Sequence, residues 1–312
     1  VISGLMCTLF GWRAVFVVSL VGGIVVAAAG VKHVQNVGER SNTTLDILSV
    51  VLLAAGVTAF VYSVGEFSTD LITGIVTLFA AIVLLGLFAA RQLNLEHPVL
   101  NVRPMASVRF WPACLLVVVS MMTTFSMSVL LPLYFEGAYG MTALVAGLLI
   151  LPAIACNAVT SIVGGRVMDA RGAWPLLPVG FALIAVGQTA ISMTAASMNI
   201  GVVVALTVVV YAGVGLVLSP SQTAGLETLP AAEHPHGTAL LNTWNMIAAS
   251  FGPSLFIGLL SSSAATAGAA GAATDVAQAI GFATAVRVAA VIAVVGFVAS
   301  LVYARRESHM SH

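Results

Sequence analysis

The sequence is poor in charge and in cysteine. Asp, Glu, Lys and Arg together make up 7% of the 312 residues, and the formal net charge is zero. Such a chain has no basic field with which to attract nucleic acid. Its three cysteines stand singly in apolar sequence, so we expect small buried hydrophobes and no metal or redox motif. Paired catalytic acids, a Ser/His set and a phosphate-binding glycine-rich loop are absent from the sequence, and we expect neither an enzyme nor a bound cofactor.

Long apolar runs are abundant. Hydrophobic residues make up 60% of the chain and the mean hydropathy is +1.10, whereas soluble domains are about 45–50% apolar. A helix that crosses a bilayer needs about 20 apolar residues, because its backbone groups must be satisfied within the segment. We therefore expect an all-α polytopic membrane protein with nine spans, near 14–31, 45–63, 71–90, 111–134, 142–163, 174–194, 199–219, 238–260 and 283–303.

The basic residues predict the orientation, because cytoplasmic loops retain Lys and Arg. With nine spans, one side holds Lys32, Arg40, Arg91, Arg103, Arg109, Arg166, Arg171, Arg305 and Arg306. Arg13 falls on the other side, and Arg287 is expected near the outer end of the last span. This distribution predicts a protein of the cell membrane with a cytoplasmic C-terminus. The first residues, VISGLMCTLFGWR, are already apolar and lack a basic leader, so we expect a chain that starts partway through a helix of a longer protein.

Two connecting segments are longer than the rest. Residues 91–110 are polar, then amphipathic, and contain Pro98 and Pro104, which predicts a linker along the cytoplasmic surface. Residues 261–280, SSSAATAGAAGAATDVAQAI, are rich in small residues and predict a mobile outer loop.

Several motifs occur in a familiar order. LPLYFEGAYGMTALVAGLLILPA (131–153), followed by GGRVMDARG (164–172), resembles the fourteen-helix drug:proton antiporters of the major facilitator superfamily. GWRAVF (11–16), HPVL (97–100) and GTALLN (237–242) resemble further segments of that family. The chain departs from the family pattern in several places: Glu136 replaces a Gln, Thr142 replaces a Ser, and Ala170 separates Asp169 from the basic Arg171. An Arg-Gln pair is replaced around Trp244-Asn245, and Arg287 is unusual in the last span.

The resemblance implies a major facilitator-type helical bundle that covers about helices 6–14. Residues 1–110 would hold the end of helix 5, helices 6–8 and the amphipathic linker, and residues 111–312 would form the C-terminal six-helix transporter bundle. It further implies proton-coupled export of lipophilic or cationic compounds by alternating access. The partners would then be the lipid bilayer, the substrate, protons and a missing N-terminal half of the transporter.

Polar residues within the runs are the candidates for a substrate cavity. Ser120, Thr124 and Ser128 recur every four residues and share one helix face, with Met127 beside them. Asn157 and Asn245 are amides in apolar runs, which predicts that they face other helices or water. The alternative for the hydroxyl face is that each Ser or Thr bonds its own i−4 carbonyl.

Two further sets of residues are candidates for coupling and gating. Glu136 lies at the outer end of a run, where it is either a proton-coupling carboxylate or an ordinary interfacial acid. The resemblance assigns Gly165, Arg166, Asp169, Arg171 and Gly172 to a cytoplasmic gating loop, with Asp169 just before the next helix and in reach of either arginine. The alternative is a solvated turn whose charges only fix the topology.

Other functions stay open at this level. The same fold serves metabolite carriers, and a non-transporting truncated protein or assembly partner would have the same composition. A membrane enzyme is the third alternative, disfavoured because the sequence lacks clusters of acids and nucleophiles. His234 and His236 flank a proline without further ligands, which is too little for a metal site.

Overall fold

The computed structural model describes residues 10–33, 46–66, 70–95, 98–108, 110–174 and 176–308. These residues form long α-helices joined by short connections. The α-helices are α2 (Trp12–His33), α3 (Ile47–Glu66), α4 (Leu71–Asn94), α5 (Phe110–Tyr139), α6 (Ala143–Arg171), α7 (Leu176–Thr194), α8 (Ile200–Glu227), α9 (His234–Ala269) and α10 (Thr274–Ser308). Three 3-10 turns accompany them: η1 (Arg103–Ala106), η2 (Ala195–Ser197) and η3 (Ala231–Glu233).

The expectation of nine spans is confirmed within the described residues, since nine helices there are long and apolar enough to cross a membrane. Their ends differ from the prediction. The expected mobile loop at 261–280 is wrong, because α9 continues to Ala269 and α10 begins at Thr274. Alanine is the best helix former, and this alanine-rich stretch simply extends both helices. Arg287 consequently lies thirteen residues inside α10, not near its end, and its side chain is exposed.

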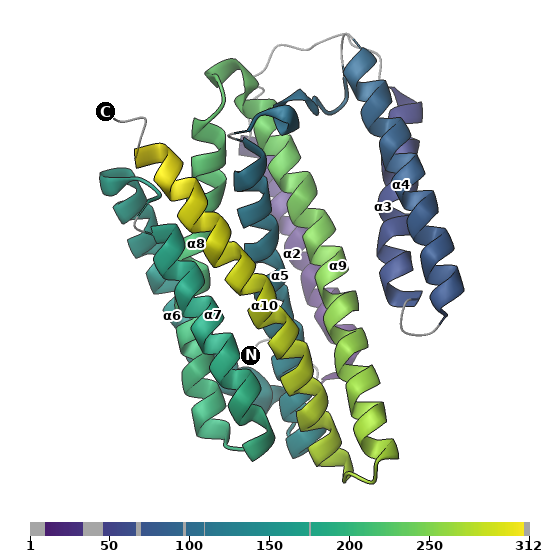
Figure 1. Ribbon diagram of the computed structural model, residues 1–312, viewed down its shortest axis with the longest axis vertical. Coiled ribbons are helices and arrows are strands. Elements are labelled where there is room, and N and C mark those ends of the chain that lie inside the picture. The colour runs from purple at the N-terminus through teal and green to yellow at the C-terminus, as the bar shows by residue number, and fades with distance from the viewer. Residues whose placement is uncertain are drawn as a thin grey trace.

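The helices run alternately up and down, so their ends gather at two opposite ends of the molecule (Figure 1). We call one of these the basic end. It holds the last turns of α4, α6, α8 and α10, with Arg91, Arg103, Arg166 and Arg171 among its described residues. The linker from α4 to α5 and the turn from α8 to α9 also lie there. The grouping of basic residues predicted from the sequence is therefore reproduced in space for these four arginines; Arg40 and Arg109 lie outside the described residues.

Helices α5–α10 form the main bundle, with α5 as its most buried member. Of the most apolar window of α5, 61% of the residues are buried. Glycines allow close crossings in this bundle: a Cβ added at Gly213 of α8 would lie 2.6 Å from the carbonyl oxygen of Gly180 on α7. Small residues at helix crossings are the usual means of packing in lipid, where no hydrophobic force drives helices together.

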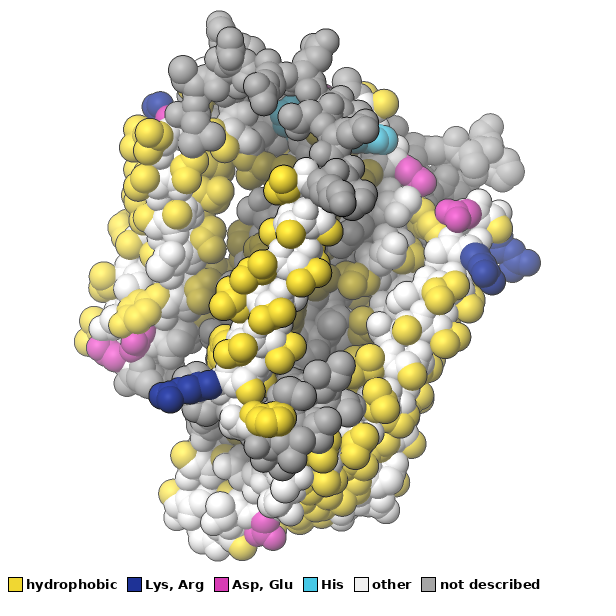
Figure 2. Space-filling model, turned by 180° about the vertical axis from the view of Figure 1, so that it is seen from behind, with side chains coloured by type: hydrophobic (Ala, Val, Ile, Leu, Met, Phe, Trp, Pro, Cys, Tyr) yellow, Lys and Arg dark blue, Asp and Glu magenta, His cyan; other side chains and the backbone are white. Residues whose placement is uncertain are grey.

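The helices before α5 are more loosely attached. Helices α3 and α4 pack on each other as a hairpin, and α3 reaches the bundle through a stacked ring pair between Phe60 and Phe251 of α9, with centroids 5.4 Å apart. None of the apolar window of α2 is buried. Figure 2 shows the molecule from behind. Hydrophobic side chains cover the helices on this side, and the few charged side chains lie toward the helix ends. Such a surface suits lipid or further protein.

Candidate functional site

The predicted hydroxyl face of α5 exists, and its hydroxyls are satisfied within their own helix. Ser120, Thr124 and Ser128 donate to the carbonyls of Leu116, Ser120 and Thr124 over 2.7, 2.8 and 2.9 Å. Their exposure rises along the helix, from a buried Ser120 through a half-buried Thr124 to an exposed Ser128. Each hydroxyl proton is therefore used internally, and the oxygen lone pairs remain available to accept a further hydrogen bond.

Two of the predicted cavity residues meet at a tyrosine that the sequence did not single out. The Ser128 hydroxyl lies 3.3 Å from the Tyr211 hydroxyl of α8. From α6, the Asn157 side-chain amide donates to the Tyr211 carbonyl over 3.1 Å. Tyr211 is thus the point where polar groups of α5, α6 and α8 converge. Its signal in the sequence is a single tyrosine within the apolar run VVVYAGVG.

Glycine explains why α6 can come so close to α8 at this point. A Cβ added at Gly215, one turn after Tyr211, would lie 2.7 Å from the Asn157 carbonyl oxygen. Any larger residue would push the two backbones apart and break the bond from Asn157 to Tyr211. The local sequence Tyr211-Ala212-Gly213-Val214-Gly215 therefore positions the polar group and the crossing together.

The remaining predicted cavity residues are more deeply buried. Met127 is fully buried in the core of the bundle, so it does not line an open cavity in this structure. Asn245 of α9 is 7% exposed, and its side-chain oxygen has no hydrogen-bond partner. The Ser221 hydroxyl of α8 is likewise buried without a hydrogen-bond partner.

Helix geometry places these two unpartnered groups at one level. A Cβ on Gly225 of α8 would lie 3.0 Å from Ala113 and 3.8 Å from Leu241 of α9. Ser221 and Asn245 each lie four residues from that contact, toward the middle of the molecule, and keep the same faces. Buried polar atoms without partners cost about 1–3 kcal/mol each, so this level of the bundle suits a polar group or a water molecule.

A further polar contact, missed in the sequence, lies between α5 and α7. The Gln188 amide approaches the Ser126 hydroxyl at 3.4 Å, and both residues are fully buried. The Gln188 side-chain oxygen and the nearby Thr123 hydroxyl lack partners. This contact lies inside the bundle, and the complete burial of both residues identifies it as a polar part of the core.

The gating segment is helical, which corrects the expected loop. Residues Gly165 to Arg171 form the last turns of α6, and only Gly172 ends the helix, with φ of +74°. Asp169 therefore sits at the negative end of the α6 dipole and not at the positive start of α7. Within the described residues no ion pair joins it to Arg166 or Arg171, and all three side chains are exposed.

Charge is confined to the helix ends around this site. Among the described side chains of α5, α6, α8 and α9, the Asp, Glu and Arg residues are Glu136, Arg166, Asp169, Arg171 and Glu227. All of them lie within about two turns of a helix end. Glu136 is exposed near the end of α5 opposite the basic end, where no described group bonds its carboxylate. The middle of the four helices therefore presents hydroxyl, phenol, amide and apolar surface without a counter-ion.

His234 and His236 lie in the first turn of α9. No group of three or more potential metal ligands occurs among the described residues. The His234 ring instead lies 3.1 Å from the Leu229 carbonyl oxygen.

Comparison with known proteins gives consistent results. A family profile, the Major Facilitator Superfamily, matches residues 1–253. The lincomycin resistance protein LmrB of Listeria monocytogenes is 32% identical over 83% of this chain and 56% of its own length. A multidrug resistance protein B homolog of Mycobacterium tuberculosis is 24% identical over 83% of this chain and 49% of its own. The riboflavin transporter RibZ of Clostridioides difficile is 22% identical over 82% of this chain and 56% of its own.

The chain spans about half the length of these curated relatives. The resistance proteins among them support the placement in the drug:proton antiporter family that the motifs predicted. With nine apolar helices in its described part and a profile match over most of its length, this chain is a multi-pass membrane protein that belongs to the major facilitator superfamily.

Proposed function

We propose that this chain is part of an exporter of lipophilic or cationic compounds that works by alternating access and is driven by proton entry. The observation that carries the proposal is the convergence of Ser128, Asn157 and Tyr211 from three helices. Polar but uncharged groups surrounded by apolar surface accept varied substrates without one strict geometry. The names of the resistance-protein relatives support the direction of transport. The protein would be a carrier and not an enzyme.

The mechanism we propose is a rocking motion of helices α5–α10, within residues 111–312, against the part of the relatives that this chain does not span. Residues 1–110 would contribute the hairpin and linker at the side of that bundle. The positive-inside rule puts the basic end, with the C-terminus, in the cytoplasm of the cell. The exposed charges of Arg166, Asp169 and Arg171 would then serve as a gate on the cytoplasmic side, contacting the other half of the transporter.

Proton coupling needs a carboxylate whose protonation changes as access alternates. Glu136 is the acid at the outer end of α5, but its side chain is exposed and has no partner among the described groups. We therefore place the coupling carboxylate in the part of the relatives that this chain does not span. Glu136→Gln is accordingly expected to leave proton-driven transport intact.

The test is uptake into inside-out membrane vesicles that carry the transporter, driven by an imposed pH gradient. Ethidium and lincomycin are suitable probes, the first a lipophilic cation and the second named in a relative. Tyr211→Phe removes only the hydroxyl that meets Ser128, and Asn157→Leu removes the amide that holds Tyr211. Each is expected to reduce uptake at low substrate concentration about three- to tenfold, the usual range for one neutral hydrogen bond.

Tyr134→Phe is the matched control. The Tyr134 hydroxyl is also buried and donates to a carbonyl, that of Ala195, over 2.9 Å, but it lies at the end opposite the basic end. Uptake should persist in this variant. Absence of gradient-driven uptake with either probe in the unmodified transporter would overturn the transport proposal. Normal uptake in both Tyr211→Phe and Asn157→Leu would overturn the proposed site.

A second candidate function is transport of a metabolite by the same site. The riboflavin transporter among the relatives favours it, and a site rich in hydroxyl and amide groups suits a polar ring system. Competition decides between the two functions in the same vesicles: riboflavin that suppresses ethidium uptake at low concentration supports the metabolite carrier.

A further inference from the structure

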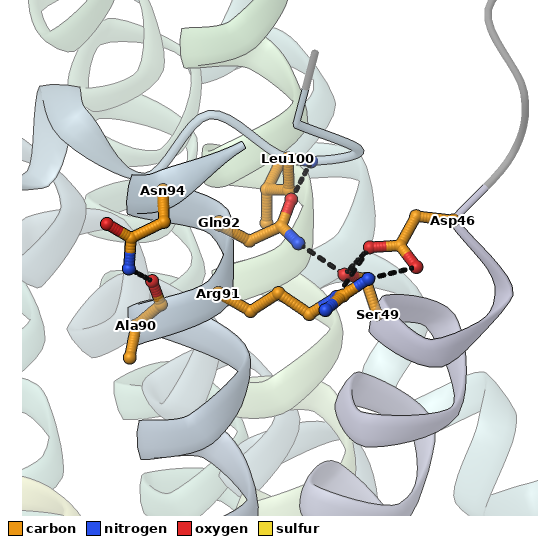
Figure 3. Close-up of polar contacts among 7 residues, drawn as sticks. All are labelled: Asp46, Ser49, Ala90, Arg91, Gln92, Asn94 and Leu100. Carbon is orange, nitrogen blue, oxygen red and sulfur yellow. Dashed lines mark hydrogen bonds and ion pairs between the residues drawn. The ribbon is translucent and has the colours of Figure 1, made fainter. Parts of the chain in front are cut away.

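A polar network occupies the basic end of the α3–α4 hairpin (Figure 3). Asp46 immediately precedes α3, and Arg91 lies in the last turn of α4. The Arg91 guanidinium donates twice to the Asp46 carboxylate, from Nε to Oδ2 over 2.7 Å and from Nη2 to Oδ1 over 3.1 Å. This bidentate geometry is the most specific form of an Arg–carboxylate pair.

The network continues inward from the ion pair. The Ser49 hydroxyl donates to Asp46 Oδ2 over 2.6 Å, and the Gln92 side-chain nitrogen donates to the Ser49 oxygen over 2.6 Å. The Gln92 side-chain oxygen then accepts the backbone N–H of Leu100 over 3.0 Å. Ser49 and Gln92 are almost completely buried. Leu100 belongs to the linker between α4 and α5, so the chain of bonds ends on the linker backbone.

Leu100 carries the connection into the bundle. Its buried side chain joins a second apolar cluster of buried residues, separate from the main core, made of Phe88, Leu100, Phe110, Cys114, Val117, Leu229, Leu240 and Leu241. These residues come from α4, the linker, the first turns of α5, the α8–α9 connection and the first turns of α9. The hairpin therefore contacts the basic ends of the helices that carry Ser128, Tyr211 and Asn245 in two ways, directly through Phe88 of α4 and through Leu100 of the linker.

We propose that Asp46, Ser49, Arg91 and Gln92 form a linker clamp, which holds Leu100 in place and makes the hairpin move together with the basic ends of α5 and α9. The transport part of this inference rests on the proposed function. An exposed ion pair by itself is worth little, and Arg91 is 39% exposed. If the linker lifted, the buried Gln92 side-chain oxygen would lose its partner, the Leu100 N–H, and this bond supplies the specificity.

The clamp has a native reporter. Cys114 of α5 is 2% exposed and lies in the same apolar cluster as Leu100. If the linker lifts, N-ethylmaleimide should reach this thiol. In transporter with Cys7 and Cys156 replaced by alanine, the labelling rate in membranes without substrate then measures the opening of the cluster.

Two variants break the clamp at different points. Arg91→Gln removes the bidentate ion pair with Asp46. Gln92→Met keeps the side-chain volume but removes the two hydrogen bonds of the Gln92 side chain, to Ser49 and to the Leu100 N–H. Each is expected to raise the Cys114 labelling rate about tenfold or more, because each leaves buried or charged partners unpaired. Gln92→Met keeps the test decisive if Arg91→Gln does not fold, which gel filtration of the purified transporter reveals.

Asp70→Asn is the matched control. Asp70 is a hairpin acid at the opposite helix end: it accepts from the Ile72 N–H over 3.0 Å and from the Thr73 hydroxyl over 2.6 Å at the start of α4. That end of the hairpin lies opposite the linker, so Cys114 labelling should stay within about twofold of the unmodified rate, since only a local cap is lost.

Transport measurements distinguish a clamp that couples the hairpin to the movement of α5 and α9 from one that only holds the linker. Both clamp variants are expected to lower the maximal ethidium uptake rate several-fold and to leave the half-saturating concentration unchanged, because the groups around Tyr211 are untouched. Unchanged Cys114 labelling in both variants would overturn the clamp. Faster labelling with an unchanged uptake rate would overturn its coupling role. If the unmodified transporter moves no probe, the proposed function fails, and the labelling result still decides whether the linker is clamped.

Discussion

The α3–α4 hairpin and the α5–α10 bundle are both built of apolar helices but are held in different ways. The buried share of the apolar window is 17% for both α3 and α4, whereas in the bundle it ranges from 17% for α6 to 61% for α5. The bundle gains its contacts from glycine crossings and buried aromatic residues, whereas the hairpin meets it at a ring pair and at the apolar cluster that contains Phe88 and Leu100. Hydropathy therefore determines that a helix enters the membrane, and small residues and paired polar groups determine what it contacts there.

The largest expected effect is a difference in lost stability when one aromatic ring is removed from each region. Phe282 of α10 is fully buried and stacks on Tyr134 with centroids 4.1 Å apart, whereas Phe60 of the hairpin is only partly buried where it stacks on Phe251. Phe282→Ala should cost near the lower end of about 3–5 kcal/mol, because in lipid the cavity term remains while the water-transfer term shrinks. Phe60→Ala should cost about 0.5–1.5 kcal/mol, the value of an aromatic pair.

Thermal unfolding of the purified transporter in detergent measures both losses. The unmodified transporter is the reference, and gel filtration before heating ensures that only folded protein is compared. A loss for Phe60→Ala as large as that for Phe282→Ala would contradict the description of the hairpin as the more loosely attached region.

A smaller effect is expected from the glycines. Gly213→Ala would set a Cβ against the Gly180 carbonyl oxygen and the Ile184 side chain, at 2.6 and 2.8 Å, and should destabilise the bundle by about 1–3 kcal/mol. The matched change is Gly86→Ala on α4, where a Cβ meets nothing within 4 Å. That substitution should stabilise the protein by up to about 1 kcal/mol through helix propensity. Thermal unfolding in detergent again measures the change in stability. Equal changes in unfolding temperature for Gly213→Ala and Gly86→Ala would refute the role of glycine crossings.

The sequence predicted the membrane spans well because a run of about 20 apolar residues has few alternatives to a helix. It misplaced helix ends where residues favour helix without being strongly apolar, as in the alanine-rich 261–280 and in GGRVMDARG. Small and charged residues there were taken as loop signals, but helices continue beyond the hydrocarbon when their residues allow it.

The candidate site was only partly predictable. The spacing of Ser120, Thr124 and Ser128 correctly predicted a shared face, and the amide of Asn157 correctly predicted a helix contact. Tyr211 was missed because a single aromatic residue in an apolar run gives no periodic signal. The clamp was missed because Asp46 and Arg91 are 45 residues apart, and only the return of the chain in a hairpin brings them together.

The smallest expected effect concerns pH and again separates the two regions, since the described ion pair belongs to the hairpin. Hydrogen bonds from Arg91 and Ser49 hold the pKa of Asp46 well below its usual value of 3.8. A carboxyl whose pKa is lowered on folding adds stability that is complete above the unfolded pKa and is lost only as the pH falls through the folded one. The clamp should therefore be constant from about pH 6 to about pH 8, far above that window. The measurement is the ratio of Cys114 labelling in Arg91→Gln to that in the unmodified transporter, which cancels the titration of the thiol itself. A ratio that changes more than about twofold across this range would mean that a group other than Asp46 controls the linker.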